Sequence, residues 1–215
     1  MNEAKYVLIG APGWGSAIAE ALLELSGLPY RVEDIDPTKP TSESKRLTSL
    51  NPLAQVPTLL LPDGTVMSES AAIALHVADR APAAALVPPP GDPTRDAFLR
   101  WLVFIVANVY PMYTVGDFPG RFVSGEAAGK ELRASTDAYR DKSWRIVEAA
   151  IAPSPWFLGT RFSALDVYAK VMTHWRPRRD WFRDNCPKLM SVALAADKEP
   201  RLAKVWQRNF PAQTG

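Results

Sequence analysis

Apolar and polar positions follow two different patterns along the first eighty residues. Some short apolar runs have the length of a strand, while residues 16–25 repeat apolar side chains every three or four positions, as a helix does. The pattern predicts strands at 6–10 and 30–35, a helix at 16–25, a loop with a short helix at 37–50, a hairpin at 58–67 and a helix at 71–80. This order is typical of a small α/β domain with a mixed sheet.

A proline-rich segment follows these elements. Residues 81–93 contain five prolines and one glycine, a composition that interrupts helices and strands. Beyond it, only helical spacing recurs. We expect helices at 95–115, 126–151, 164–174, 187–196 and 200–210, with a kink at Pro111. The sequence therefore predicts an α/β domain over 1–81, a linker over 82–93 and an all-α domain over 94–215.

The hairpin region also carries features of a ligand site. Pro57 opens the strand, and a cis Val56–Pro57 bond would turn the Val56 N–H and C=O outward, where an extended peptide could pair with them. Ser68 is the expected N-cap of the next helix, with Glu69 and Ser70 in its first turn. Free amides and the positive helix end favour an anionic ligand group there. The simpler alternative is a capped helix with a solvated Glu69.

Two motifs carry a family resemblance. The runs Gln55 to Leu59 and Glu69 to Ile73 resemble the glutathione-binding signature of cytosolic glutathione transferases. Far downstream, Phe157 to Gly159 and Ser163 to Asp166 resemble the folding signature of that family's helical domain, and Ser163 with Asp166 fits a capping box. The resemblance implies a thioredoxin-like N-terminal domain, an all-α C-terminal domain and a homodimer.

The resemblance also implies where glutathione binds. Val56 would pair with the cysteinyl unit through its backbone, Pro57 would be cis, and Glu69 and Ser70 would hold the γ-glutamyl end. The glycyl carboxylate needs a cation or an amide donor. Gln55 is the favoured candidate, and the alternatives in the same stretch are Lys39, Lys45 and Arg46.

Catalysis requires that the pKa of the glutathione thiol fall below about 8.5, because the thiolate is the nucleophile. A hydroxyl at a helix N-terminus can stabilise the thiolate. The family keeps its activating side chain in the turn after the first strand, so Ser16 is the catalytic candidate. The alternatives are that Ser16 only caps the helix, or that backbone amides at 14–16 activate the thiol. Gly15 stands where one bacterial class has a cysteine, and the local pattern is most similar to uncharacterised bacterial members.

The electrophile pocket is expected between the domains, lined by Trp14, Tyr110 and Tyr113, whereas Trp101 and Phe104 are assigned to the core. The predicted function is a glutathione S-transferase that adds glutathione to a small hydrophobic electrophile, as in detoxification. One alternative is glutathione-dependent reduction of disulfides or peroxides. A second is a non-catalytic glutathione- or ligand-binding protein.

Charge and composition argue against several other classes of protein. The chain has 25 basic and 23 acidic residues, which gives no reason to expect a nucleic-acid partner, and the basic run 176–179 is assigned to a solvated face. One cysteine and two histidines make a metal site unexpected. No leader and no apolar run of about 18 residues stands out, so a cytoplasmic protein without a membrane span is expected.

Overall fold

A four-stranded mixed sheet forms the first half of the chain. The computed structural model describes residues 5–36 and 38–211. Strands β1 (Tyr6–Gly10) and β2 (Tyr30–Asp34) pair in parallel, and β3 (Thr58–Leu60) and β4 (Val66–Met67) add to them antiparallel, in the order β2-β1-β3-β4. Gly64 takes a φ of 87° in the turn between β3 and β4, a conformation that glycine adopts without strain.

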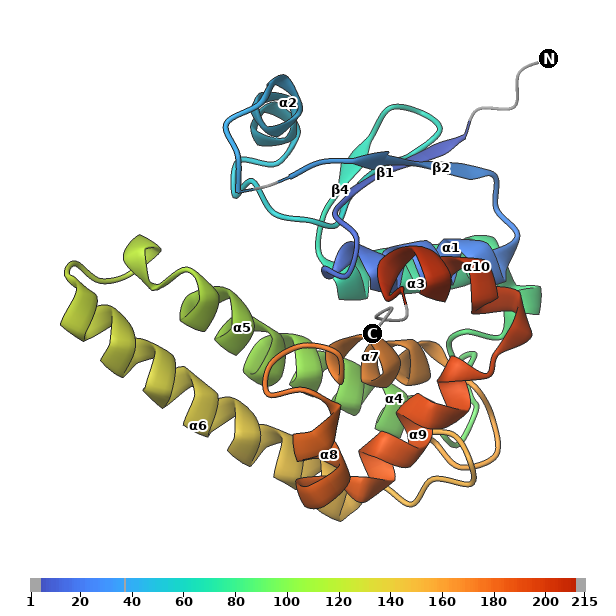
Figure 1. The fold of residues 1–215 in the computed structure, drawn as a ribbon. Helices are drawn as coiled ribbons and strands as arrows, with labels where there is room; N and C mark the ends of the chain where they lie inside the picture. The colour runs from blue at the N-terminus through green and yellow to red at the C-terminus, as the bar shows by residue number, and fades with distance from the viewer. Residues whose placement is uncertain (1–4, 37, 212–215) are drawn as a thin grey trace.

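Helices cover both faces of this sheet. Helices α1 (Ser16–Ser26) and α3 (Ser70–Arg80) lie side by side on the face toward the rest of the molecule, and α2 (Ser42–Leu50) lies apart on the other side (Figure 1). Helix α1 is buried almost all round, because the sheet covers one side and the C-terminal helices cover the other. This is the thioredoxin-like domain that the sequence predicts.

The second half is helical throughout the residues that are described. Its elements are a 3₁₀ turn (Pro82–Ala84), α4 (Arg95–Phe104), a π-helical turn (Ile105–Val109), α5 (Tyr110–Asp117), a 3₁₀ turn (Pro119–Arg121), α6 (Glu126–Ala150), α7 (Ala164–Met172), α8 (Arg179–Asn185), α9 (Pro187–Asp197), a 3₁₀ turn (Pro200–Leu202) and α10 (Ala203–Asn209). Helix α7 is completely buried, and α10 returns to α1 (Figure 1). One apolar core therefore runs through both halves.

The long helix that contains Pro111 is interrupted just before this residue. The turn Ile105–Val109 is a π-helix, and α5 begins directly after it. Proline has no N–H to donate to the carbonyl four residues earlier, so the hydrogen-bond ladder rearranges at this point. The extra residue in the turn changes which face of the helix Tyr110 occupies.

Two further boundaries differ from the sequence-based expectation. Helix α3 begins at Ser70, and its N-cap is Glu69 rather than Ser68. Helix α8 is not among the helices that the sequence pattern predicts. The capping box is confirmed: Asp166 accepts hydrogen bonds from the backbone N–H of Ser163 and of Phe157, both at 2.7 Å. Burial raises the pKa of Asp166 to about 6.

The segment Arg95–Asp117 is long and apolar enough, by length and composition, to cross a membrane. In this fold part of the segment belongs to the protein core, where Phe98, Trp101, Ile105 and Val109 are buried. A core helix of a water-soluble protein meets the same criteria, so composition gives this segment no membrane assignment.

Candidate active site

Two adjoining cavities lie along the junction between the sheet domain and the helices. The larger has a volume of about 1000 Å³ and the smaller about 310 Å³. They share four lining residues: Gln55, Val56, Tyr110 and Thr114. All the expected glutathione contacts, Gln55, Val56, Pro57, Glu69 and Ser70, line the smaller cavity. The expected electrophile contacts, Trp14, Tyr110 and Tyr113, line the larger one.

Val56 presents a free backbone edge to the cavities. The Val56–Pro57 bond is cis, as the resemblance implies. No residue in the described part of the chain hydrogen-bonds to the N–H or C=O of Val56. The buried Asn51 holds the loop from behind: its amide donates to the Gln55 carbonyl and the Thr58 hydroxyl, both at 3.1 Å, and its oxygen accepts from Leu53 N–H. Val56 is thus fixed in place with both backbone polar groups available to a ligand.

Glu69 and Ser70 occupy the start of α3. Glu69 has φ 65° and ψ 110°, and a non-glycine residue in such a conformation is uncommon and often marks a functional site. The Ser70 hydroxyl accepts a hydrogen bond of 2.8 Å from Tyr168 of α7. Its own proton therefore remains available to donate. The first amides of α3 lie at the same place, so this end of the cavity can bind a group that carries both an ammonium and a carboxylate.

The structure distinguishes among the four residues that are candidates for binding the glycyl carboxylate. Lys39 pairs with Asp36 at 2.8 Å, and Arg46 pairs with Glu33. Neither they nor Lys45 line a cavity, whereas Gln55 lines both. The geometry favours Gln55.

Ser16 has a different setting from the one expected of a thiol activator. It is buried, its hydroxyl accepts from Ala11 N–H at 2.9 Å, and it donates to Ala11 C=O at 3.0 Å. A hydroxyl has a single proton, and here that proton is bound within the turn. Ser16 also lines neither cavity. Ser16 does not cap α1 either, because the N-cap is Gly15 and no side chain makes a capping hydrogen bond there. A role for Ser16 in thiol activation stays a prediction.

The same turn is held by distant residues that the sequence did not indicate. Gly13 N–H donates to the Asn209 side chain at 3.1 Å, and Gly13 C=O accepts from the Trp175 indole at 2.8 Å. Asn209 also donates to the buried Glu20 at 2.8 Å. No local pattern in the sequence distinguishes Asn209. Both C-terminal contacts fix the turn against the large cavity.

Two of the three arginines in the basic run 176–179 form ion pairs, which corrects the assignment of this run to a solvated face. Arg176 binds Asp137 through two nitrogens, at 2.7 and 3.0 Å, and also pairs with Asp117. Arg179 binds Asp197 in the same manner. Arg178 and Arg121 line the large cavity, and neither forms an ion pair with any described residue.

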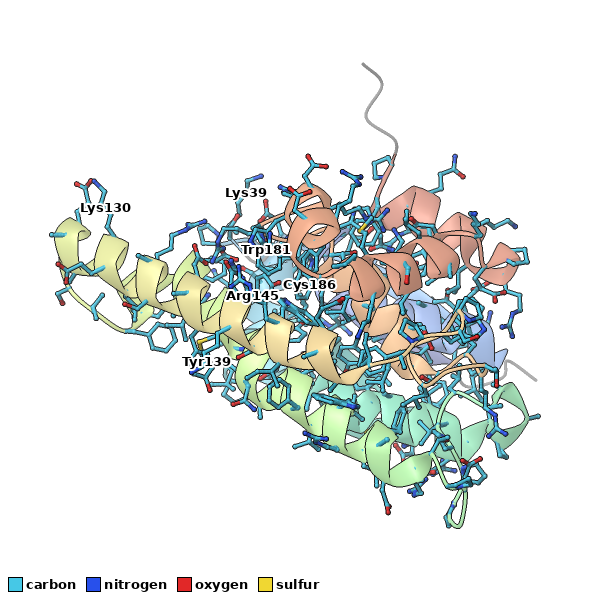
Figure 2. All side chains as sticks on the ribbon, turned by 90° about the horizontal axis from the view of Figure 1, so that it is seen from below. Lys39, Lys130, Tyr139, Arg145, Trp181 and Cys186 are labelled. Carbon is cyan, nitrogen blue, oxygen red and sulfur yellow. The ribbon has the colours of Figure 1, made fainter. Side chains whose placement is uncertain are left out.

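The single cysteine lies away from both cavities. Cys186 is fully buried between α8 and α9, among side chains that include Arg145 and Trp181 (Figure 2). Burial raises its pKa to about 12, so it is inert as a nucleophile at neutral pH. Within residues 5–36 and 38–211, no group of three or more His, Cys, Asp or Glu residues is placed to hold a metal ion.

Comparisons with known proteins agree with this architecture. A family model described as "Glutathione S-transferase, N-terminal domain" matches residues 16–80. The uncharacterized GST-like protein YncG of Escherichia coli K12 is 38% identical over 201 residues, which cover 93% of this chain and 96% of that protein. The glutathione S-transferase GstA of E. coli O157:H7 is 28% identical over 76% of this chain and 79% of its own length. A solved glutathione transferase homolog from Sulfitobacter, with bound glutathione, superimposes with a TM-score of 0.78 at 25% identity, covering 94% of this chain and 97% of that one. The chain belongs to the glutathione S-transferase family.

Proposed function

We propose that this protein is a glutathione S-transferase that binds glutathione as an extended peptide in the small cavity and adds its thiol to an electrophile held in the large one. The observation that carries the proposal is the unpaired backbone edge of Val56 in the same cavity as Glu69 and Ser70. The glutathione bound to the Sulfitobacter relative supports the choice of ligand.

Each part of glutathione has a chemical counterpart along the small cavity. The cysteinyl N–H and C=O pair with Val56, as in strand addition. The γ-glutamyl ammonium meets the Glu69 carboxylate, and its carboxylate meets the Ser70 hydroxyl and the free amides of α3. Gln55 offers its amide to the glycyl carboxylate.

The large cavity defines the second substrate. Its walls include Trp14, Phe118, Trp175 and Phe210, and Arg121 and Arg178 stand among the lining residues with no carboxylate partner in the described chain. Aromatic walls suit an apolar electrophile, and guanidinium groups that have no carboxylate partner suit one that carries an anionic substituent. In the reaction the thiol proton passes to water, a sulfur–carbon bond forms, and the leaving group departs with its bonding electrons.

Two further properties are part of the proposal. The buried Cys186 takes no part in the proposed reaction, so glutathione supplies the reacting thiol. We also propose a cytoplasmic homodimer in which the α/β domain of 1–81 and the helical domain of 94–215 are joined by 82–93. Sedimentation of the purified protein checks the dimer.

Calorimetry with glutathione, followed by conjugation of a chlorodinitrobenzene, tests the proposal. We expect binding and turnover by the native protein. Glu69→Gln removes the negative charge that meets the ammonium, so glutathione affinity should fall by about tenfold or more. Glu126→Gln is the matched control, because Glu126 is exposed and pairs only with Lys130 on the surface of α6. Absence of glutathione binding by the native protein would overturn the proposal.

A further inference from the structure

Gly15 is a glycine for reasons of space and not of backbone conformation. Its φ of −60° and ψ of −21° are ordinary right-handed helical values, which any L-residue adopts. A Cβ built on Gly15 would, however, lie 1.6 Å from the hydroxyl oxygen of Tyr110 and 2.9 Å from Cζ of the same side chain. The phenol therefore occupies the space in which any side chain at position 15 would stand.

The Tyr110 hydroxyl also lies close to the free backbone edge of Val56. The same point above Gly15 is 3.5 Å from the carbonyl oxygen of Val56. Tyr110 lines both cavities, so its hydroxyl lies where the glutathione cavity opens into the electrophile cavity. A cysteinyl residue that pairs with Val56 brings its sulfur to this junction.

The side chain is held firmly while its proton remains available. The Tyr110 ring packs edge-on against Trp175, with ring centroids 5.2 Å apart. The π-helical turn Ile105–Val109 ends immediately before it, and such turns often occur at functional sites. Across the described residues, no hydrogen bond is made by the Tyr110 hydroxyl, whereas Ser16 donates its only proton to Ala11.

On these grounds we infer that the Tyr110 hydroxyl, contributed by the helical domain, is the hydrogen-bond donor that stabilises the glutathione thiolate. This inference rests on the proposed function. The thiol releases its proton to water, and the phenol keeps its own proton while donating a hydrogen bond to the sulfur. The conjugation step then forms the sulfur–carbon bond as described above.

The surroundings of Tyr110 keep it in the donor form. Burial raises its pKa above the usual value, and the nearby negative charge of Glu69 adds to this effect. The phenol therefore stays protonated at the pH at which the thiol ionises. The charged residues that line the two cavities around it are Glu69, Asp117, Arg121, Arg133, Arg176 and Arg178, and burial lowers the pKa of His174 to about 3, so that this ring is neutral.

Titration of the thiolate absorbance of bound glutathione tests the inference. In Tyr110→Phe we expect the thiol pKa to return toward about 8.5 and kcat/KM near neutral pH to fall about tenfold to hundredfold, with little change in glutathione affinity. Tyr139→Phe is the matched control: it removes an exposed hydroxyl that donates to Asn108 on the surface, and the thiol pKa should not move.

Gly15→Ala gives a second, independent test. The added Cβ displaces the hydroxyl of Tyr110, so the thiol pKa should rise as in Tyr110→Phe, and the double variant should be no worse than either single one. An unchanged thiol pKa in Tyr110→Phe would overturn the inference, as would a shift produced by Ser16→Ala alone. In both cases glutathione still binds, which separates this failure from failure of the proposed function, where the native protein binds no glutathione.

Discussion

The cradle (residues 55–57 with 69 and 70) lines the small cavity, whereas the thiol turn (residues 11–16) lines the adjoining large one through residues 12–15, and the two are held in opposite ways. Asn51 fixes the cradle loop from a few residues away in sequence. The thiol turn is fixed by Trp175 and Asn209, which follow Gly13 by 162 and 196 residues. The residues proposed to bind glutathione are thus fixed by local contacts, whereas the position of the turn depends on how the helical domain docks. Variants that loosen one region should separate affinity from reactivity.

The largest effect is expected from Asn209→Ala. It leaves the Gly13 N–H without its acceptor and removes a donor from the buried carboxylate of Glu20, whose pKa is already raised by burial. Unfolding in urea should show a loss of about 3 kcal/mol. Conjugation should slow while the Kd for glutathione stays nearly constant. Asn185→Ala on α8 is the control, because its hydrogen bonds to Arg145 and Trp181 are more exposed.

Asn51→Ala should have the next largest effect, and it should lower glutathione affinity rather than the rate of conjugation. Three hydrogen bonds that shape the loop before Val56 are lost, which should lower the free energy of unfolding by about 2 kcal/mol. Glutathione affinity should fall several-fold, and the pKa of the thiol that is still bound should not change. If this variant altered the thiol pKa and spared affinity, the division between the two regions would be wrong.

Ser70→Ala breaks a hydrogen bond that connects the sheet domain to the helical domain. It removes one donor to the γ-glutamyl carboxylate and leaves the buried Tyr168 hydroxyl without its acceptor. Glutathione affinity should fall about tenfold, and stability should drop by about 1 kcal/mol. Adding Tyr168→Phe removes the stranded hydroxyl, so stability should recover while affinity does not. Calorimetry and urea unfolding on the two variants measure both quantities.

Trp175→Phe should have the smallest effect. It loses the hydrogen bond from the indole to Gly13 but keeps an aromatic ring against Tyr110 and Tyr113. We expect a loss of about 1 kcal/mol in stability and a modest fall in kcat/KM at unchanged glutathione affinity. A fall in affinity instead would show that Trp175 also supports the cradle.

The same contrast explains what the sequence could predict. Pro57, the turn at 62–64 and the pair Glu69–Ser70 each carry a short-range signal. The turn joins β3 to β4, and Pro57, Glu69 and Ser70 line the same small cavity, as expected. The strands and the longer helices were equally accessible, because their apolar periods are local. The cap of α3 was misplaced by one residue, since the unusual backbone conformation of Glu69 has no signature in a side chain.

The partners of the thiol turn could not be predicted in this way. The sequence offers Ser16 as an activator or as a helix cap, because both roles need a hydroxyl at the start of the helix. In the structure this hydroxyl bonds to Ala11 instead, and a contact of that kind has no signature in the sequence. Arg176 and Arg179 looked solvated because their partners, Asp137 and Asp197, lie on other helices. The hydrogen bonds of Asn209 depend entirely on where α10 packs.

The overlap between position 15 and the Tyr110 hydroxyl also dictates an order in which this site can change. A cysteine or serine side chain introduced at position 15 collides with the phenol unless residue 110 has first become smaller. Replacing Tyr110 first avoids the collision, but the route then passes through a variant that is open and lacks a donor on either side. A side chain at position 15 and the Tyr110 phenol would occupy the same volume. To move the activating group from one domain to the other, a designer must therefore replace Tyr110 before Gly15.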